Sequence, residues 1–151
     1  MKKSRLASLL ALIVGVAGIL LGLFASNAEK TFYYYDRWSK GHSVLLGSQC
    51  YELPGDWLPT QENATGRDVQ VRLHFSAPPV FAMIRQAETV APLLAKAQKI
   101  RSVQTGVDAL RFDTPQGERL FIVHNSLLGL AVTGDSEEAL ERLASAIRPC
   151  K

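Results

Sequence analysis

Few side chains in this sequence have types and spacing suited to catalysis or metal binding. The three histidines, His42, His74 and His124, are separated by 32 and 50 residues. The sequence contains no HExxH, no GxSxG and no glycine-rich phosphate loop. Ser126 lies close to His124 along the chain, but proximity in sequence does not supply the hydrogen bond that activates a nucleophile. We therefore predict that the protein is not an enzyme and has neither a metal site nor a cofactor.

The two cysteines, Cys50 and Cys150, offer a different chemistry. They lack the CxxC motif and the nearby histidine spacing of zinc sites, so a metal pair or a catalytic thiol has little support. In an oxidising compartment, a lone pair of cysteines is expected to form a disulfide. This bond would close a loop of about 100 residues and stabilise the fold by up to about 4.7 kcal/mol in the chain-entropy model.

Other side chains could bind a partner without reacting with it. Trp57 follows the turn sequence Pro-Gly-Asp and is expected to pack in the core, with contact to a ligand as the alternative. Arg72 and His74 alternate with apolar residues in a strand predicted over residues 69–75. They would share its polar face, where they could contact an anionic partner.

A long amphipathic helix is expected to carry the remaining candidates. Apolar residues recur at helical spacing from Val80 to Ala97, although Pro92 should kink or divide the helix. The opposite face and the C-terminal end would form either ordinary solvated surface or a binding face. Their basic residues are Arg85, Lys96, Lys99 and Arg101.

Strands are predicted on both sides of this helix. Residues 43–53 indicate a first strand that is interrupted near Gly47. After the helix, apolar segments separated by turn residues indicate a three-stranded meander over residues 103–114, 118–124 and 127–133. Its last two strands are apolar at nearly every position, as expected where both faces of a sheet are covered.

The final helix has the clearest boundary signals. Asp135 could serve as its N-cap, with Glu138 as the capping-box partner, and Pro149 would stop it. Cys150 follows at once, so the disulfide would join the end of this helix to the first strand. The buried stripe would consist of Leu140, Leu143, Ala144 and Ile147.

The N-terminal part of the chain has the pattern of a membrane segment. Residues 6–24, from Leu6 to Phe24, carry no charge, and Lys2, Lys3 and Arg5 precede them. As a helix rising about 1.5 Å per residue, the run would be roughly 28 Å long, close to the roughly 30 Å hydrocarbon core of a bilayer. The positive-inside rule keeps the basic end in the cytoplasm, so residue 29 onward is predicted to be extracytoplasmic.

Residues 1–28 are interpreted either as a transmembrane anchor or as a signal peptide cleaved after Ser26-Asn27-Ala28. Three observations favour the anchor. The apolar run is longer than the core of a signal peptide, which usually has about 7–15 residues. The aromatic residues after the run are typical of a membrane-interface belt. Small residues also share one helix face, where they would permit close helix packing and a homodimer. They include Gly15, Gly18 and Gly22.

Net charge gives no support for nucleic-acid binding. The formal charge of the chain is +3, and the three basic residues before the apolar run account for it. Without them, fourteen basic residues balance fourteen acidic residues. A nucleic-acid-binding domain needs a basic stripe on its own folded surface.

These observations predict one exported domain of the α+β class. Residues 29–42 would form a juxtamembrane linker, and residues 43–151 are enough for one modest core. We expect a mainly antiparallel sheet of about five strands, packed by two or three helices.

The order of elements resembles the small α/β sandwich domains of the DcrB and PsbP type. The likeness rests on Tyr51-Glu52-Leu53-Pro54-Gly55-Asp56-Trp57 and on the ending from Gly134-Asp135-Ser136-Glu137-Glu138 to Ile147-Arg148. It covers roughly residues 43–148. Such domains include bacterial envelope proteins and chaperone or adaptor modules for secreted effectors. They are largely non-enzymatic and share no catalytic residues, so the resemblance implies binding.

Three functional hypotheses follow. The leading one is a single-pass protein of the bacterial inner membrane whose periplasmic domain binds a protein partner, as a subunit or assembly factor of an envelope complex. The first alternative is an immunity protein that neutralises a periplasmic toxin, since such inhibitors can be single small exported domains. The second is a carrier of a small ligand or lipid, which needs a large apolar pocket under Trp57. Signal cleavage would instead release the domain into the periplasm.

Overall fold

The computed structural model describes residues 2–62 and 66–151, and within them it describes no side chains for residues 2–11, 24, 26, 29, 40, 61 and 62. The chain divides into two compact units, Met1–Trp38 and Ser39–Lys151. The second unit holds all the strands formed by the described residues.

The first unit consists of helix α1 (Lys2–Lys40), whose last two residues belong to the second unit. It contains the predicted apolar run and also most of the predicted linker. No helix of the described residues combines the length and the hydropathy of a membrane span. Much of the predicted run, residues 6–11 and Phe24, lies outside the residues whose side chains are described.

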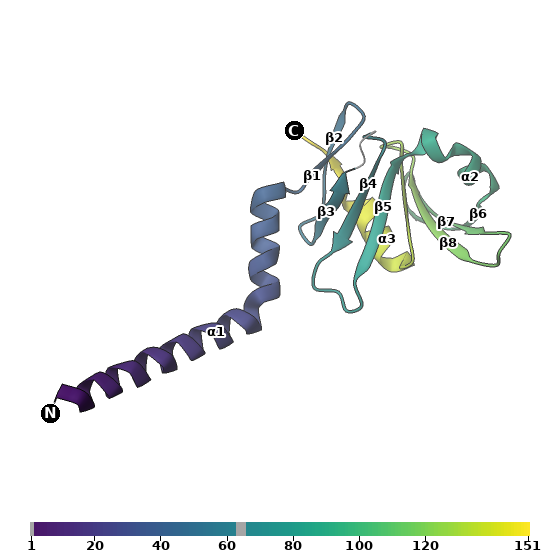
Figure 1. Ribbon diagram of the computed structural model, residues 1–151. Coiled ribbons are helices and arrows are strands. Elements are labelled where there is room, and N and C mark those ends of the chain that lie inside the picture. The colour runs from purple at the N-terminus through teal and green to yellow at the C-terminus, as the bar shows by residue number, and fades with distance from the viewer. Residues whose placement is uncertain (1, 63–65) are drawn as a thin grey trace. The chain divides into compact units, whose positions relative to one another are not determined.

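The second unit is built on a seven-stranded antiparallel sheet with the order β3-β4-β5-β9-β8-β7-β6 (Figure 1). The α+β class and the antiparallel sheet are therefore confirmed, although the sheet has more strands than predicted. The strands are β3 (Trp57–Glu62), β4 (Asp68–Leu73), β5 (Val80–Gln86), β6 (Gln98–Gln104), β7 (Val107–Asp113), β8 (Arg119–Asn125) and β9 (Leu130–Gly134).

A second, three-stranded sheet has the order β1-β2-β10. The predicted first strand is a hairpin of β1 (Ser43–Leu46) and β2 (Gln49–Glu52), and Gly47 in its turn has a φ of 63°. Glycine adopts this left-handed conformation without steric strain. The third strand, β10 (Arg148–Pro149), pairs with β2 and returns the C-terminus to the start of the domain.

The predicted long helix over residues 80–97 is wrong. Residues 80–86 form β5, and only the short 3₁₀ helix η1 (Ala87–Val90) and α2 (Ala91–Lys96) are helical. Val80, Ala82 and Ile84 fit a period of two as well as a helical spacing, and pairing with both β4 and β9 selects the strand. Pro92 lies in the first turn of α2, where a missing N–H is tolerated.

The last helix, α3 (Glu137–Ala146), buries the predicted stripe. Its predicted capping box is wrong, because Ser136 is the N-cap and forms no side-chain capping bond. With Ser136 as the N-cap, Glu138 is the second residue of the helix. A capping box requires the glutamate to be the third. Glu137 and Glu138 instead place negative charge in the first turn, where it interacts favourably with the positive end of the helix dipole.

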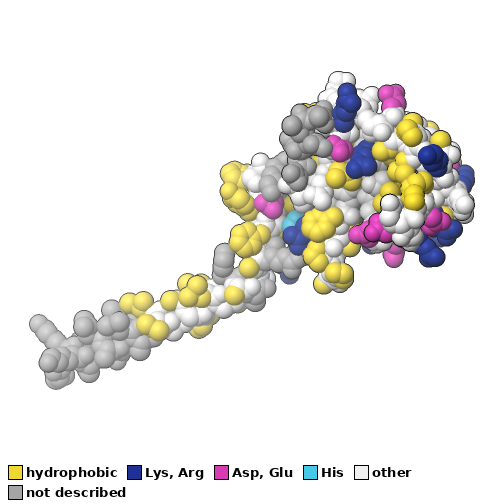
Figure 2. Space-filling model, turned by 45° about the vertical axis from the view of Figure 1, so that its right-hand side comes forward, with side chains coloured by type: hydrophobic (Ala, Val, Ile, Leu, Met, Phe, Trp, Pro, Cys, Tyr) yellow, Lys and Arg dark blue, Asp and Glu magenta, His cyan; other side chains and the backbone are white. Residues whose placement is uncertain are grey.

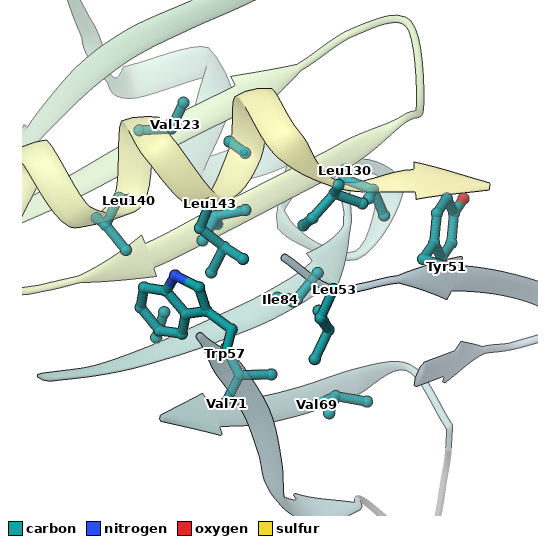
Figure 3. Close-up of a cluster of buried hydrophobic side chains, with 14 of the residues drawn as sticks. Tyr51, Leu53, Trp57, Val69, Val71, Ile84, Val123, Leu130, Leu140 and Leu143 are labelled. Atoms are coloured by element: carbon teal, nitrogen blue, oxygen red, sulfur yellow. The ribbon is translucent and has the colours of Figure 1, made fainter. Parts of the chain in front are cut away.

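Two clusters of buried side chains cover the two faces of the large sheet. The larger cluster joins α3 and the small sheet to one face (Figure 3). On the other face, Val90 at the start of α2 packs with Ile122 of β8 and Ala131 of β9. The prediction that β8 and β9 are covered on both sides is therefore confirmed.

Candidate functional site

The predicted disulfide is present. Cys50 of β2 and Cys150 after β10 are bonded, with their Cα atoms 5.3 Å apart. The backbone N–H of Cys150 also donates to the carbonyl oxygen of Cys50 at 3.0 Å. Two segments separated by 100 residues are thus joined, which is consistent with a compartment outside the cytoplasm.

Trp57 packs in the core, the first of the two roles expected for it. Its side chain is 2% exposed. Leu140 and Leu143 of α3 lie on one side of the indole and Val71 of β4 lies on another (Figure 3). The turn before it is also as predicted, since the Trp57 N–H donates to the Pro54 carbonyl at 3.0 Å. No ring face is open to a ligand.

The predicted basic helix face does not exist, because its residues lie on three different elements. Arg85 is on β5, Lys96 is in the last turn of α2, and Lys99 and Arg101 are on β6. Arg85 Nε lies 3.8 Å from Asp68 Oδ2. This placement follows directly from residues 80–86 being a strand.

Both basic residues of β6 are paired with acidic groups. Lys99 Nζ lies 2.7 Å from Asp108 Oδ1. Arg101 lies 2.7 Å from Glu141 and 3.3 Å from Glu137, both on α3. Hydrogen bonds from Lys99 and then Ser102 hold the pKa of the Asp108 carboxyl below its usual value. These cations are therefore part of the domain's own charge network.

Arg72 and His74 lie at the end of β4. The guanidinium carbon of Arg72 is 6.0 Å from the ring centre of Phe81, a cation–π distance. The strand ends at Leu73, so His74 stands just beyond it and meets the ring of Phe75 edge-on. Phe75 is the last apolar residue of the strand predicted over residues 69–75, where it would share the buried face with Val69, Val71 and Leu73. It has a φ of 59° and is 51% exposed, so that prediction is wrong for Phe75.

The other two histidines lie on separate elements. His42 is an exposed residue before β1, while His124 lies on β8 opposite Asp108 of β7. Among the described residues, no three His, Cys, Asp or Glu side chains are grouped as metal ligands. The glycines of α1 line an open surface: a Cβ added at any of the three predicted packing positions, Gly15, Gly18 and Gly22, would have nothing within 4 Å.

A feature that sequence reasoning missed is the turn at residues 126–129, between β8 and β9. It presents Leu127, whose side chain is 72% exposed. Underneath, Leu127 rests on Gly106 in the β6–β7 turn, since a Cβ built on that glycine would lie 2.5 Å from Leu127 Cγ. Because Gly106 has no side chain, Leu127 can pack directly on its backbone.

Hydrogen bonds fix this turn to several elements. Asn125, which is 5% exposed, accepts from the Leu128 N–H at 3.1 Å and donates to the Ala144 carbonyl of α3 at 2.9 Å. Ser126 donates twice to the Gly106 carbonyl, through its N–H at 2.8 Å and its hydroxyl at 3.0 Å. The Ala87 N–H of η1 donates to the Gly129 carbonyl at 2.8 Å. An exposed leucine is thus held on a turn with little freedom to move.

Tyr51 connects the turn to the small sheet. Its hydroxyl donates to the Leu128 carbonyl at 3.2 Å and bonds to the Gln49 side chain. Burial raises the pKa of this phenol above its usual value. In Figure 3 the Tyr51 ring stands beside β10.

Two depressions flank the turn. One, of about 370 Å³, is lined by Gln49, Cys50, Tyr51, Leu127, Leu128 and Pro149. The other, of about 250 Å³, is lined by residues that include Ser48, Gln86, Glu88, Leu128 and Gly129. We call the turn and these two depressions the disulfide-end surface. The sequence does contain a short indication of this surface. Asn125, Ser126 and Gly129 are typical turn residues, and they enclose two apolar residues, Leu127 and Leu128.

Comparison of the chain with protein-family models, with curated proteins and with solved structures gives no match in any of the three. The resemblance to DcrB and PsbP domains therefore stays a prediction.

Proposed function

We propose that the protein is a membrane-tethered module whose extracytoplasmic domain binds a protein partner at the disulfide-end surface. The tether belongs to the first unit of the chain, and the binding surface belongs to the second.

The tether is supported by the surface of α1. Between residues 12 and 23 the described side chains include no charged group. The large apolar ones are all exposed: Leu12, Ile13, Val14, Val16, Ile19, Leu20, Leu21 and Leu23. Figure 2 shows hydrophobic side chains along the visible side of the helix. Water disfavours such a surface, whereas lipid does not. Together with the basic residues before the run, this favours insertion with the domain in the bacterial periplasm.

The observation that carries the binding proposal is the exposure of Leu127 on a turn held by several hydrogen bonds. A large apolar side chain that is 72% exposed is more stable when a partner buries it. Binding also orders the groups at an interface, and a group that is already held loses less freedom. The adjacent depressions give a partner concave surface on both sides, and the glutamines around them offer polar contacts for its rim.

The ligand-carrier hypothesis has less support than protein binding. A carrier needs an apolar cavity, and the region of Trp57 is filled by the larger core cluster. The two depressions beside the turn are open surface features whose linings combine polar and apolar groups. Such a surface is better suited to contact with the side chains of a protein than to enclosing the acyl chain of a lipid.

Partner capture tests the proposal. The full chain is crosslinked in its native membranes, and the protein that copurifies stoichiometrically is identified and purified. Its dissociation constant is then measured for the wild type, for Leu127→Asp and for Phe75→Asp. The control also changes an exposed apolar residue to aspartate, at a φ of 59° that aspartate tolerates.

We expect Leu127→Asp to weaken binding at least about tenfold, because burial of a leucine contributes about 1.5–3 kcal/mol. Phe75→Asp should bind like the wild type. Equal affinity for all three proteins would show that the partner docks elsewhere. Absence of any partner above background would contradict protein binding altogether. The identity of the partner, a toxin or an envelope subunit, decides between an immunity protein and an assembly role.

A further inference from the structure

The second half of α1 has two chemically different faces. At 100° per residue, the exposed aromatic residues between positions 30 and 39 occupy one half of the circumference, and Lys30, Asp36 and Arg37 occupy the other. We call residues 30–39 the aromatic segment. Its exposed aromatic side chains are Phe32, Tyr34, Tyr35 and Trp38.

Side-chain contacts keep the two faces distinct. On the charged face, Arg37 donates to the hydroxyl of Tyr33 at 2.7 Å. On the aromatic face, the rings of Tyr35 and Trp38 lie 6.4 Å apart in a tilted arrangement. Trp38 nevertheless remains 83% exposed. The aromatic face is therefore formed by side chains of the helix itself.

The aromatic segment follows directly on the apolar run but does not continue it in a straight line. Figure 1 shows α1 bending between its purple and blue portions. Two side chains in this part of the helix bond to the carbonyl four residues earlier, Asn27 to Leu23 at 3.0 Å and Thr31 to Asn27 at 3.1 Å. Such bonds loosen the backbone ladder and bend helices.

We infer that the aromatic segment lies along the outer surface of the membrane, with its aromatic face in the interfacial region of the lipids and its charged face turned away from them. Tryptophan and tyrosine favour this depth, because their rings are apolar while the indole N–H and the phenol hydroxyl need polar partners. A helix with one charged and one aromatic face lies in the interface plane. This inference rests on the proposed tether and adds an orientation for the segment that follows it.

The charge of the segment indicates which lipids suffice. Lys30, Asp36 and Arg37 sum to a formal charge of +1, too little for strong attraction to an anionic surface. Binding should therefore depend on the aromatic side chains, persist in zwitterionic phosphatidylcholine and change little with salt.

Tryptophan fluorescence of the full chain in phosphatidylcholine vesicles tests the inference. The chain has two tryptophans, and Trp57 is 2% exposed in the domain core. The difference between the wild type and Trp38→Phe therefore isolates Trp38 without changing the core. Lipids carrying a quencher near the headgroup, or near the bilayer centre, report its depth. Flotation of the same vesicles reports the tether.

We expect the chain to float with the vesicles and the Trp38 signal to be blue-shifted, with stronger quenching near the headgroup than at the bilayer centre. If the chain floats but the Trp38 emission is that of tryptophan in water and is not quenched by either lipid, the inference is wrong and the proposed tether is still supported. Stronger quenching at the bilayer centre would also overturn it, since the segment would then span the membrane. Absence of flotation would contradict tether and inference together.

A pair of variants tests the two faces. Tyr34→Ser with Tyr35→Ser should shift the remaining Trp38 signal toward that of water, because the aromatic face is reduced to half of its rings. Lys30→Ser, on the charged half of the helix, should leave the signal unchanged. An equal shift in both proteins would contradict a specific role for the aromatic face.

Discussion

The side-chain amide of Asn125 donates a hydrogen bond of 2.9 Å to the carbonyl oxygen of Ala144. This bond connects the last residue of β8 to α3 beneath the exposed turn at residues 126–129. The same side chain accepts from the Leu128 N–H, so one buried residue orders both the turn and its support.

Replacement of Asn125 should therefore destabilise the domain strongly. Asn125→Ala leaves a backbone acceptor at Ala144 and a backbone donor at Leu128 without these partners, and each such group costs about 1–3 kcal/mol when buried. We expect the free energy of unfolding, measured with urea, to fall by about 2–4 kcal/mol. The control, Ser126→Ala, removes one exposed bond of the same turn and should cost under about 1 kcal/mol. Equal losses for the two variants would refute the role of Asn125.

The disulfide should account for a large part of the stability. Replacement of both Cys50 and Cys150 by serine should lower the free energy of unfolding by about 2–4 kcal/mol. Reductant should lower the stability of the wild type to a similar level and leave the double variant unchanged, because the disulfide is the group that reductant cleaves. If complete reduction leaves the free energy of unfolding of the wild type unchanged, this expectation is wrong.

Asp135 should contribute little to α3. A true N-cap residue costs about 1 kcal/mol when it is replaced by alanine, but the N-cap here is Ser136 and no side chain caps the helix. We expect Asp135→Ala to change the free energy of unfolding by less than about 0.5 kcal/mol. A loss of about 1 kcal/mol would restore the capping box that the sequence predicted.

The carboxyl of Asp108 should titrate below the usual range for aspartate. Its hydrogen bonds from Lys99 and Ser102 favour the charged form and lower its pKa. A lowered native pKa contributes stability at pH values above the unfolded-state pKa, and this contribution is lost as the pH falls through the native value. The pKa can be measured from the carboxyl carbon shift by NMR. In Lys99→Met it should rise toward the usual value, whereas an unchanged midpoint would remove Lys99 as its main cause.

The sequence was sufficient where the signal is local or the chemistry is unambiguous. A lone cysteine pair predicted the disulfide, and the apolar stripe of α3 predicted its buried face. The strands β8 and β9 were predicted to be covered on both sides, because nearly every position in them is apolar. In each case the residues alone restrict the outcome.

Neighbours in space decided the rest. Residues 80–86 have apolar spacing that suits a helix or a strand, and they form β5 because β4 and β9 supply hydrogen-bond partners on both sides. Strand β3 escaped prediction because it contains Pro59, which only an edge strand or a bulge accommodates. It is an edge strand, with a register shift after that proline.

For the candidate site, the sequence determined the residue types, and the tertiary structure determined which of them meet. The basic residues expected on one helix face lie on three elements because that helix is replaced by a strand, a short helix and a further strand. The exposed turn is a candidate site because Gly106, Asn125 and Tyr51 converge on it from separate segments. Hydrophobic periodicity predicts which face of an element is buried, but contacts between distant segments depend on how the elements pair, and that pairing is set by the packed domain as a whole.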